Sequence, residues 1–263
     1  MNKFKAIFLG VMVLSITTFS SCKKGDLNLF SLQDDITLGQ QTRDQVLNDP
    51  SVNVLSKTTY ATQYAYLNAM RDKILNSGKV QHKADFEWEL YIIKDDATLN
   101  AFCTPGGYIF VYSGLIKYLD KESSLAGVLG HEMAHADYRH STTQMTKQYG
   151  LQTLLDIVLG NSSQSQITQV ATSLINLTFS RGDETAADKG SVTYLCPTTY
   201  NANGAADFFA KLIADPNYQS VPTFLSTHPD PGNRVNTINT ESTTQGCGTK
   251  TETTTYTAFK NSL

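Results

Sequence analysis

The chain has 263 residues, which is enough for one large domain or two small ones. Its hydrophobic share of 40% and its charged share of 17% are ordinary for a folded protein with a core of its own. The formal net charge of −3 leaves no excess of basic residues, which argues against nucleic acid as a partner.

The N-terminus has the order of a secretory signal, in which the basic stretch MNKFK precedes the apolar run Ala6–Ile16. That run is too short to span a bilayer comfortably. The following TFSSCKK resembles a bacterial lipobox, in which cleavage leaves a lipidated cysteine. We therefore expect a signal peptide over 1–21, a lipid anchor on Cys22 and a tether over 22–31. The alternative is a plain secretory peptide, because Phe19 stands where the lipobox prefers leucine.

The rest of the chain predicts an α+β domain that is mainly helical. Apolar residues three and four positions apart, in segments that end at Gly or Pro, predict helices. Alternating aromatic and β-branched residues predict strands. A Thr-rich tail with Gly and Lys is typical of irregular structure. The expected elements are helices over 32–49 and 58–78, strands over 86–96 and 106–114, mostly helices over 121–214, a short helix over 230–239 and an irregular tail over 241–263.

Three cysteines follow Cys22, and export makes a disulfide permissible. Cys196 and Cys247 both stand beside turn-forming residues and are the better pair, which would leave Cys103 as a free thiol. No C-x-x-C spacing occurs, so a cysteine metal site is not expected.

The segment GHEMAHADYRH, residues 130–140, holds three of the five histidines. On a helix, His131 and His135 share a face, and Glu132 lies between them, which gives H-E-x-x-H. Two imidazoles at this spacing can bind one zinc, and the glutamate can reach a water on it. The surrounding helix is largely apolar, so burying these side chains is costly unless they bind a metal. His140 is nine residues from His131, about 180° around a continuous helix, and is not expected to join the pair.

A catalytic zinc needs a third protein ligand. No histidine follows at the metzincin spacing, so a glutamate on a later helix is the other common solution. In SRGDETAADKG, Glu184 is the candidate ligand, and Asp188 shares its face and could orient a ligand histidine by a hydrogen bond. The alternative for Glu184 is a carboxylate that only stabilises a helix N-terminus, a role that Asp183 could fill instead.

HEMAH, SRGDETAAD and THPDPGNR, with NAFCTPGGYIFVYSGLI before them, resemble the zinc peptidase family of HtpX and the CAAX prenyl proteases. The resemblance runs from about residue 90 to residue 234 and is nearest to a soluble lipoprotein branch, because no membrane span is expected after the signal. It implies a zincin-like domain of the gluzincin type over 32–240, with a small sheet beside the zinc helix. It also implies one zinc held by His131, His135 and Glu184.

The resemblance gives Glu132 the role of general base and brings His228 and Arg234 close to the zinc. Three roles for His228 remain open: a donor to the oxyanion of the reaction, a neutral imidazole that fills the open zinc position and keeps the enzyme latent, or a loop histidine packed against Pro229. The strand 106–114 could present an edge to which an extended polypeptide substrate adds, or it could be interior core.

The sequence therefore predicts a monomeric zinc endopeptidase that is exported to the periplasm or cell envelope. We expect a lipid anchor at the outer rather than the inner membrane. Two alternatives remain, an envelope chaperone or assembly factor with a latent zinc site, and a zinc hydrolase that acts on a non-peptide amide.

Overall fold

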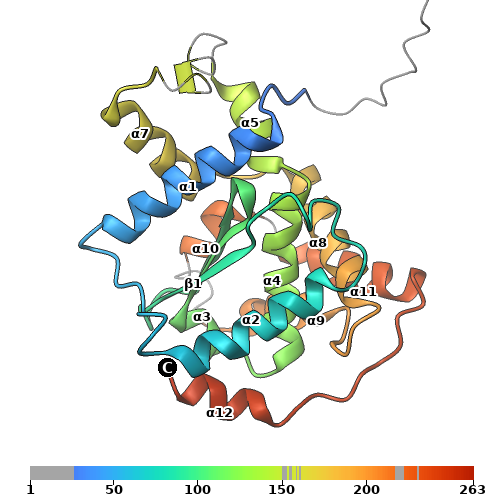
Figure 1. Cartoon of the computed structure of the whole chain (residues 1–263). Coiled ribbons are helices and arrows are strands. Elements are labelled where there is room, and N and C mark those ends of the chain that lie inside the picture. The colour runs from blue at the N-terminus through green and yellow to red at the C-terminus, as the bar shows by residue number, and fades with distance from the viewer. Residues whose placement is uncertain are drawn as a thin grey trace, which may run out of the picture.

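A computed structural model describes residues 27–149, 161–216, 222–229 and 231–263, and a few positions between 153 and 159. The signal peptide expected over 1–21 and the lipidation expected at Cys22 lie outside the described residues. Within them, none of the helices is both long and apolar enough to cross a membrane. The fold is α+β and mainly helical, as the sequence predicts, with one small sheet (Figure 1).

Two helices precede the sheet. Helix α1, Leu32–Asn48, begins with a capping box in which Ser31 and Asp34 each bond the other's backbone N–H. Helix α2, Ala61–Leu75, buries a stripe of apolar side chains against the main core. Both helices agree with the sequence prediction, although α2 begins three residues later than expected.

The sheet has three strands, β1 (Glu89–Ile93), β2 (Ala101–Thr104) and β3 (Tyr108–Tyr112), in the order β1-β3-β2. Strand β1 is parallel to β3, and β2 is antiparallel to β3. Of the two possibilities for 106–114, the structure contradicts the edge strand, because β3 pairs with a strand on each side. Strand β2, which the sequence did not predict, is one of the two edge strands of the sheet and is joined to β3 by the tight Pro105–Gly107 turn.

Helix α4, Glu122–Asp137, lies in the middle of the molecule, and every one of its residues is buried (Figure 1). It packs against β2, α8 and α9. Glycines allow the helices to approach closely, since a Cβ on Gly127 would lie 2.2 Å from the backbone nitrogen of Ala205. The other helices among the described residues are α3 (Ser113–Tyr118), α5 (His140–Gln148), α7 (Gln164–Ile175), α8 (Arg181–Leu195), α9 (Gly204–Ala214), α10 (Pro222–Thr227), α11 (Pro231–Thr244) and α12 (Thr255–Asn261).

The C-terminal segment is more ordered than the sequence predicts. Helix α11 continues to Thr244, and α12 buries Tyr256 and Phe259 in the main core. The reason is that these two aromatic side chains anchor a segment whose polar composition is otherwise typical of a loop. The disulfide between Cys196 and Cys247, with an S–S distance of 2.01 Å, confirms the expected pairing, and Cys103 is a buried free thiol.

Candidate metal centre

Helix α4 carries the H-E-x-x-H segment, and the structure places both histidines on one buried face of it. The Nε2 atoms of His131 and His135 lie 3.0 Å apart. Glu132 is buried beside them and receives a hydrogen bond from the backbone of Cys103 in β2. The edge strand of the sheet therefore lies directly beside the segment that we expect to be catalytic.

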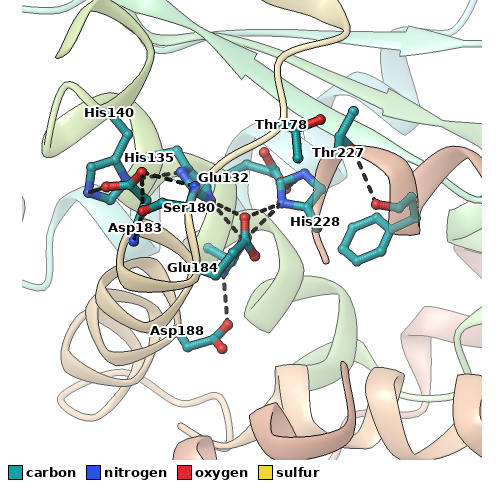
Figure 2. Close-up of polar contacts among 12 residues, drawn as sticks. Glu132, His135, His140, Thr178, Ser180, Asp183, Glu184, Asp188, Thr227 and His228 are labelled. Atoms are coloured by element: carbon teal, nitrogen blue, oxygen red, sulfur yellow. Dashed lines mark hydrogen bonds and ion pairs between the residues drawn. The ribbon is translucent and has the colours of Figure 1, made fainter. Parts of the chain in front are cut away.

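Helix α8 brings the later carboxylates to this face. It begins with a capping box between Ser180 and Asp183, which places Glu184 in the first turn and Asp188 one turn further along (Figure 2). The carboxylate oxygens of Glu184 lie 3.5 Å from the Nε2 atoms of both helix α4 histidines. Asp188 Oδ1 lies 3.0 Å from Nδ1 of His131, the ring nitrogen that points away from the group.

His228 reaches the same point from the end of α10. The segment before α8 holds this end, since Phe179 N–H donates to Thr227 O at 3.3 Å and the Thr178 hydroxyl donates to Ser226 O at 2.9 Å. The Nδ1 atom of His228 lies 3.1 Å from Glu184 Oε1 (Figure 2). The ring is buried among the site residues and is not packed solely against a loop proline.

Four residues thus offer one ligand atom each within 4.8 Å of one another: His131, His135, Glu184 and His228. Zinc–nitrogen bonds of about 2.0–2.1 Å in a tetrahedron separate ligand atoms by roughly 3.3 Å. The distances from His131 Nε2 to His135 Nε2 and to His228 Nδ1 are 3.0 and 3.4 Å, close to that separation. One buried oxygen each of Glu132 and Glu184 also has no hydrogen-bond partner among the described residues. The donor set therefore fits one zinc ion.

The guanidinium of Arg234, on α11, contacts both carboxylates of α8 that face the group, Glu184 and Asp188. Its Nε and Nη2 atoms donate to the two oxygens of Asp188 at 2.8 and 2.6 Å, which is a bidentate arrangement. Its Nη1 lies 2.7 Å from Glu184 Oε2, although without the geometry of a hydrogen bond. The guanidinium also lies 4.0 Å above the ring of Phe209. Arg234 is therefore placed to orient the carboxylates.

The electrostatics of the group suit metal binding. Burial lowers the pKa of His135 well below its usual value, so this imidazole is neutral and has a free lone pair. Burial raises the pKa of Glu132 to about 7. Burial would also raise the pKa of Glu184, but the charge of His228 and hydrogen bonds from His131 and His135 lower it below its usual value. Burial and the charge of Arg234 lower the pKa of His131, but the carboxylates of Asp188 and Glu184 bring it above its usual value, so zinc would have to displace a proton from this ring. An ionised Glu184 and neutral imidazoles are the forms that bind zinc.

His140 also lies in contact with the group, which the sequence analysis did not expect. Its Nδ1 atom lies 3.0 Å from Nδ1 of His135, because α4 ends at Asp137 and the chain turns back at Arg139. A continuous helix would have carried His140 to the opposite face, but here its ring lies against His135, although it is not one of the four donors. Phe179, which no sequence signal marked, stacks on the His135 ring at a centroid distance of 3.9 Å.

The fold and the donor set together fit the class of zinc metallopeptidases of the His-His-Glu type, in which the metal would lie between α4 and α8. A family model described as peptidase family M48 matches residues 61–242, so the chain belongs to that family. This is the zinc-dependent family that the sequence motifs resemble.

Several curated proteins are similar to this chain. It is 28% identical to the mitochondrial metalloendopeptidase OMA1 of Schizosaccharomyces pombe over 80% of this chain and 62% of that protein. It is 30% identical to the beta-barrel assembly-enhancing protease of Yersinia pestis over 65% of this chain and 37% of that protein. The metalloprotease YcaL of Escherichia coli K12 is 28% identical over 63% of this chain and 64% of that protein. The chain thus spans less than two thirds of the length of these relatives.

Proposed function

We propose that the protein is a zinc-dependent endopeptidase of the bacterial cell envelope that hydrolyses unfolded or misassembled polypeptides. The observation that carries this proposal is the convergence of four buried donor atoms beside Glu132, a buried carboxylate that is not one of the four. The envelope location rests on the secretory order of the N-terminal residues and on the similarity to beta-barrel assembly-enhancing proteases.

His131, His135 and Glu184 hold the metal in this proposal. Zinc, when bound, supplies a Lewis acid that lowers the pKa of a water toward ~7 and polarises the scissile carbonyl. Glu132 accepts the proton of the attacking water and later donates it to the leaving amine. Asp188, whose Oδ1 lies 3.0 Å from His131 Nδ1, would accept the proton of that nitrogen and so fix the tautomer of the ligand. Arg234 keeps Asp188 ionised and correctly aimed.

The substrate strand adds to β2. Asn100 O accepts from Tyr112 N–H, and the paired register then directs the backbone groups of Ala101 and Cys103 away from β3. The backbone of Cys103 is also hydrogen-bonded to Glu132, so this outer edge faces the reacting groups. Main-chain pairing at such an edge favours extended chains over folded ones and gives loose sequence specificity.

The resting site is latent in this proposal. His228 Nδ1 occupies the fourth corner of the donor set, where a water would otherwise sit. Helix α7 also packs against β2, with Ile175 beside the aromatic cluster of the sheet that includes Phe102. The position of His228 favours the second candidate function as well, an envelope chaperone or assembly factor whose zinc site stays latent.

Proteolysis of an unfolded protein separates the two functions. The mature chain should cleave casein, and a chelator should abolish the cleavage, with added zinc restoring it. Absence of any cleavage by fully zinc-loaded protein, including the His228→Ala variant, would contradict the endopeptidase proposal. The envelope location is tested separately by fractionation of cells.

A further inference from the structure

The corner between α4 and α5 has an unusual backbone. Arg139 adopts φ 58° and ψ 34°, the left-handed conformation that residues with a side chain rarely adopt. This single residue ends the path of α4 and turns the chain so that α5 begins at His140. A continuous helix would instead carry His140 away from His135. The contact between these two histidines therefore depends on the conformation of Arg139.

The side chain of Arg139 is held by the N-terminal helix. Its Nε and Nη2 atoms donate to the two carboxylate oxygens of Asp35 at 2.6 and 3.1 Å, and Nη2 also donates to Phe30 O at 2.5 Å. Asp35 lies in α1 and is only 1% exposed. A bidentate pair with a buried carboxylate is strong and geometrically specific. It accounts for the persistence of a strained backbone at a residue that is not glycine.

The same N-terminal segment also forms hydrogen bonds with α5. The Asn28 side chain donates to the Thr142 hydroxyl at 2.9 Å, and the Leu29 N–H donates to the Thr146 hydroxyl at 3.2 Å. Residues 28–35 therefore contact both sides of the corner. These residues lie before residue 61, where the match to the family model begins.

The corner matters because it supplies a hydrogen-bond acceptor for the His135 ring. Its Nε2 atom faces the other donors, so its Nδ1 carries the proton and needs an acceptor. Nδ1 of His140 lies 3.0 Å away and accepts that proton when His140 carries its own proton on Nε2. Asp183 Oδ1 lies 3.9 Å from this Nε2 and favours that tautomer (Figure 2). His140 thus aims His135 as Asp188 aims His131.

We propose that Asp35 and Arg139 are positioning residues for the metal centre. They hold the α4–α5 corner in the conformation that places His140 against His135. The inference rests on the proposed metal site, and it makes the N-terminal helix α1 a part of that site's support. Neither residue touches the metal or the substrate.

The test measures zinc affinity of the purified full chain by competition with a chromophoric chelator, together with the visible spectrum of the cobalt-substituted protein. Asp35→Asn should weaken zinc binding on the order of 10-fold, as is typical when the partner of a ligand histidine is disturbed, and should alter the cobalt bands. Arg139→Gly should bind zinc more tightly than Arg139→Ala, because glycine reaches the left-handed conformation without a side-chain clash.

The matched control is Arg43→Gln. Arg43 lies on α1, the helix that carries Asp35, and its side chain pairs with Glu89 away from the metal group. The side chain of Arg43 is 23% exposed, against 20% for that of Arg139. This control should keep the zinc affinity within about twofold and the cobalt spectrum unchanged. Wild-type affinity and spectrum in both Asp35→Asn and Arg139→Ala would overturn the proposal, even if their melting temperatures fall.

Three further outcomes are separated by this design. If Asp35→Asn does not fold, the comparison of Arg139→Gly with Arg139→Ala decides alone, and equal affinities of the two refute the inference. If the wild-type chain binds no zinc, the proposed metal site itself is wrong. If the wild type binds zinc and cleaves casein while all variants bind as tightly, only the positioning role is wrong.

Discussion

Replacing Glu132 with glutamine isolates the proposed base from the proposed ligands. The side chain is 1% exposed, and glutamine has nearly the same shape, so the packing around it should survive. Glu132 lies outside the group of four donors, so zinc should stay bound. Loss of general-base assistance typically costs 10²- to 10⁴-fold in rate, which corresponds to about 3–5 kcal/mol of transition-state stabilisation. We expect kcat/KM for labelled casein to fall by this factor.

The matched control for this variant is Glu122→Gln. Glu122 lies on the same helix, is also buried, and accepts a hydrogen bond from the Tyr66 hydroxyl at 2.7 Å, far along the helix from the metal group. Its amide variant should cleave casein at the wild-type rate. The reasoning is refuted if zinc-loaded Glu132→Gln cleaves casein as fast as wild type. Full rescue of an envelope-stress defect by Glu132→Gln in cells would instead favour the chaperone function.

Four other outcomes follow from the structure and the sequence. His135→Ala should lose the zinc found in the wild-type protein by metal analysis, and full occupancy in that variant would contradict the ligand assignment. His228→Ala should raise basal casein cleavage if the residue is a gate, whereas a fall of roughly 10²-fold would make it an oxyanion donor. Cys22→Ala should abolish labelling by a fatty-acid analogue, and an unlabelled wild type would exclude the anchor. The folded-state pKa values of Glu184 and Asp188 are lowered, so the melting temperature should fall as the pH decreases below about 4.5, a range in which Glu132, with its pKa raised to about 7, is already protonated; a midpoint that stays constant from there to about pH 3 would contradict this.

The sequence predicts three members of the donor set, and the neighbouring Asp188, because these residues lie at helical spacings. His131 and His135 share a face by the 3.6-residue period, and Glu184 and Asp188 do so on a second helix. The structure brings these four side chains together as the motifs indicate, although their catalytic and ligand roles stay predictions. No spacing argument could place His228, because its position depends on how the end of α10 is held against the segment before α8.

The elements that the sequence did not predict depend on long-range contacts. Strand β2 has only four residues, too few for a clear alternation, and it exists because it pairs with β3 and packs on α4. The left-handed turn at Arg139 depends on Asp35, which is 104 residues away in the chain. Helix α12 depends on the burial of Tyr256 and Phe259 in a core formed by earlier segments. Local propensity carries no information on such contacts.

The geometry of His228 favours one of the two functional roles left open by the sequence. If Nδ1 binds the metal, the ring proton must lie on Nε2. That nitrogen lies 3.4 Å from Oε1 of Glu132, an oxygen without a hydrogen bond among the described residues. One imidazole would thus fill the open metal position and face the base with its proton at the same time. An oxyanion donor needs its N–H free for the substrate carbonyl, whereas this N–H would face Glu132. The resting arrangement therefore favours the gate, and departure of His228 would free the fourth metal position and Glu132 in a single step.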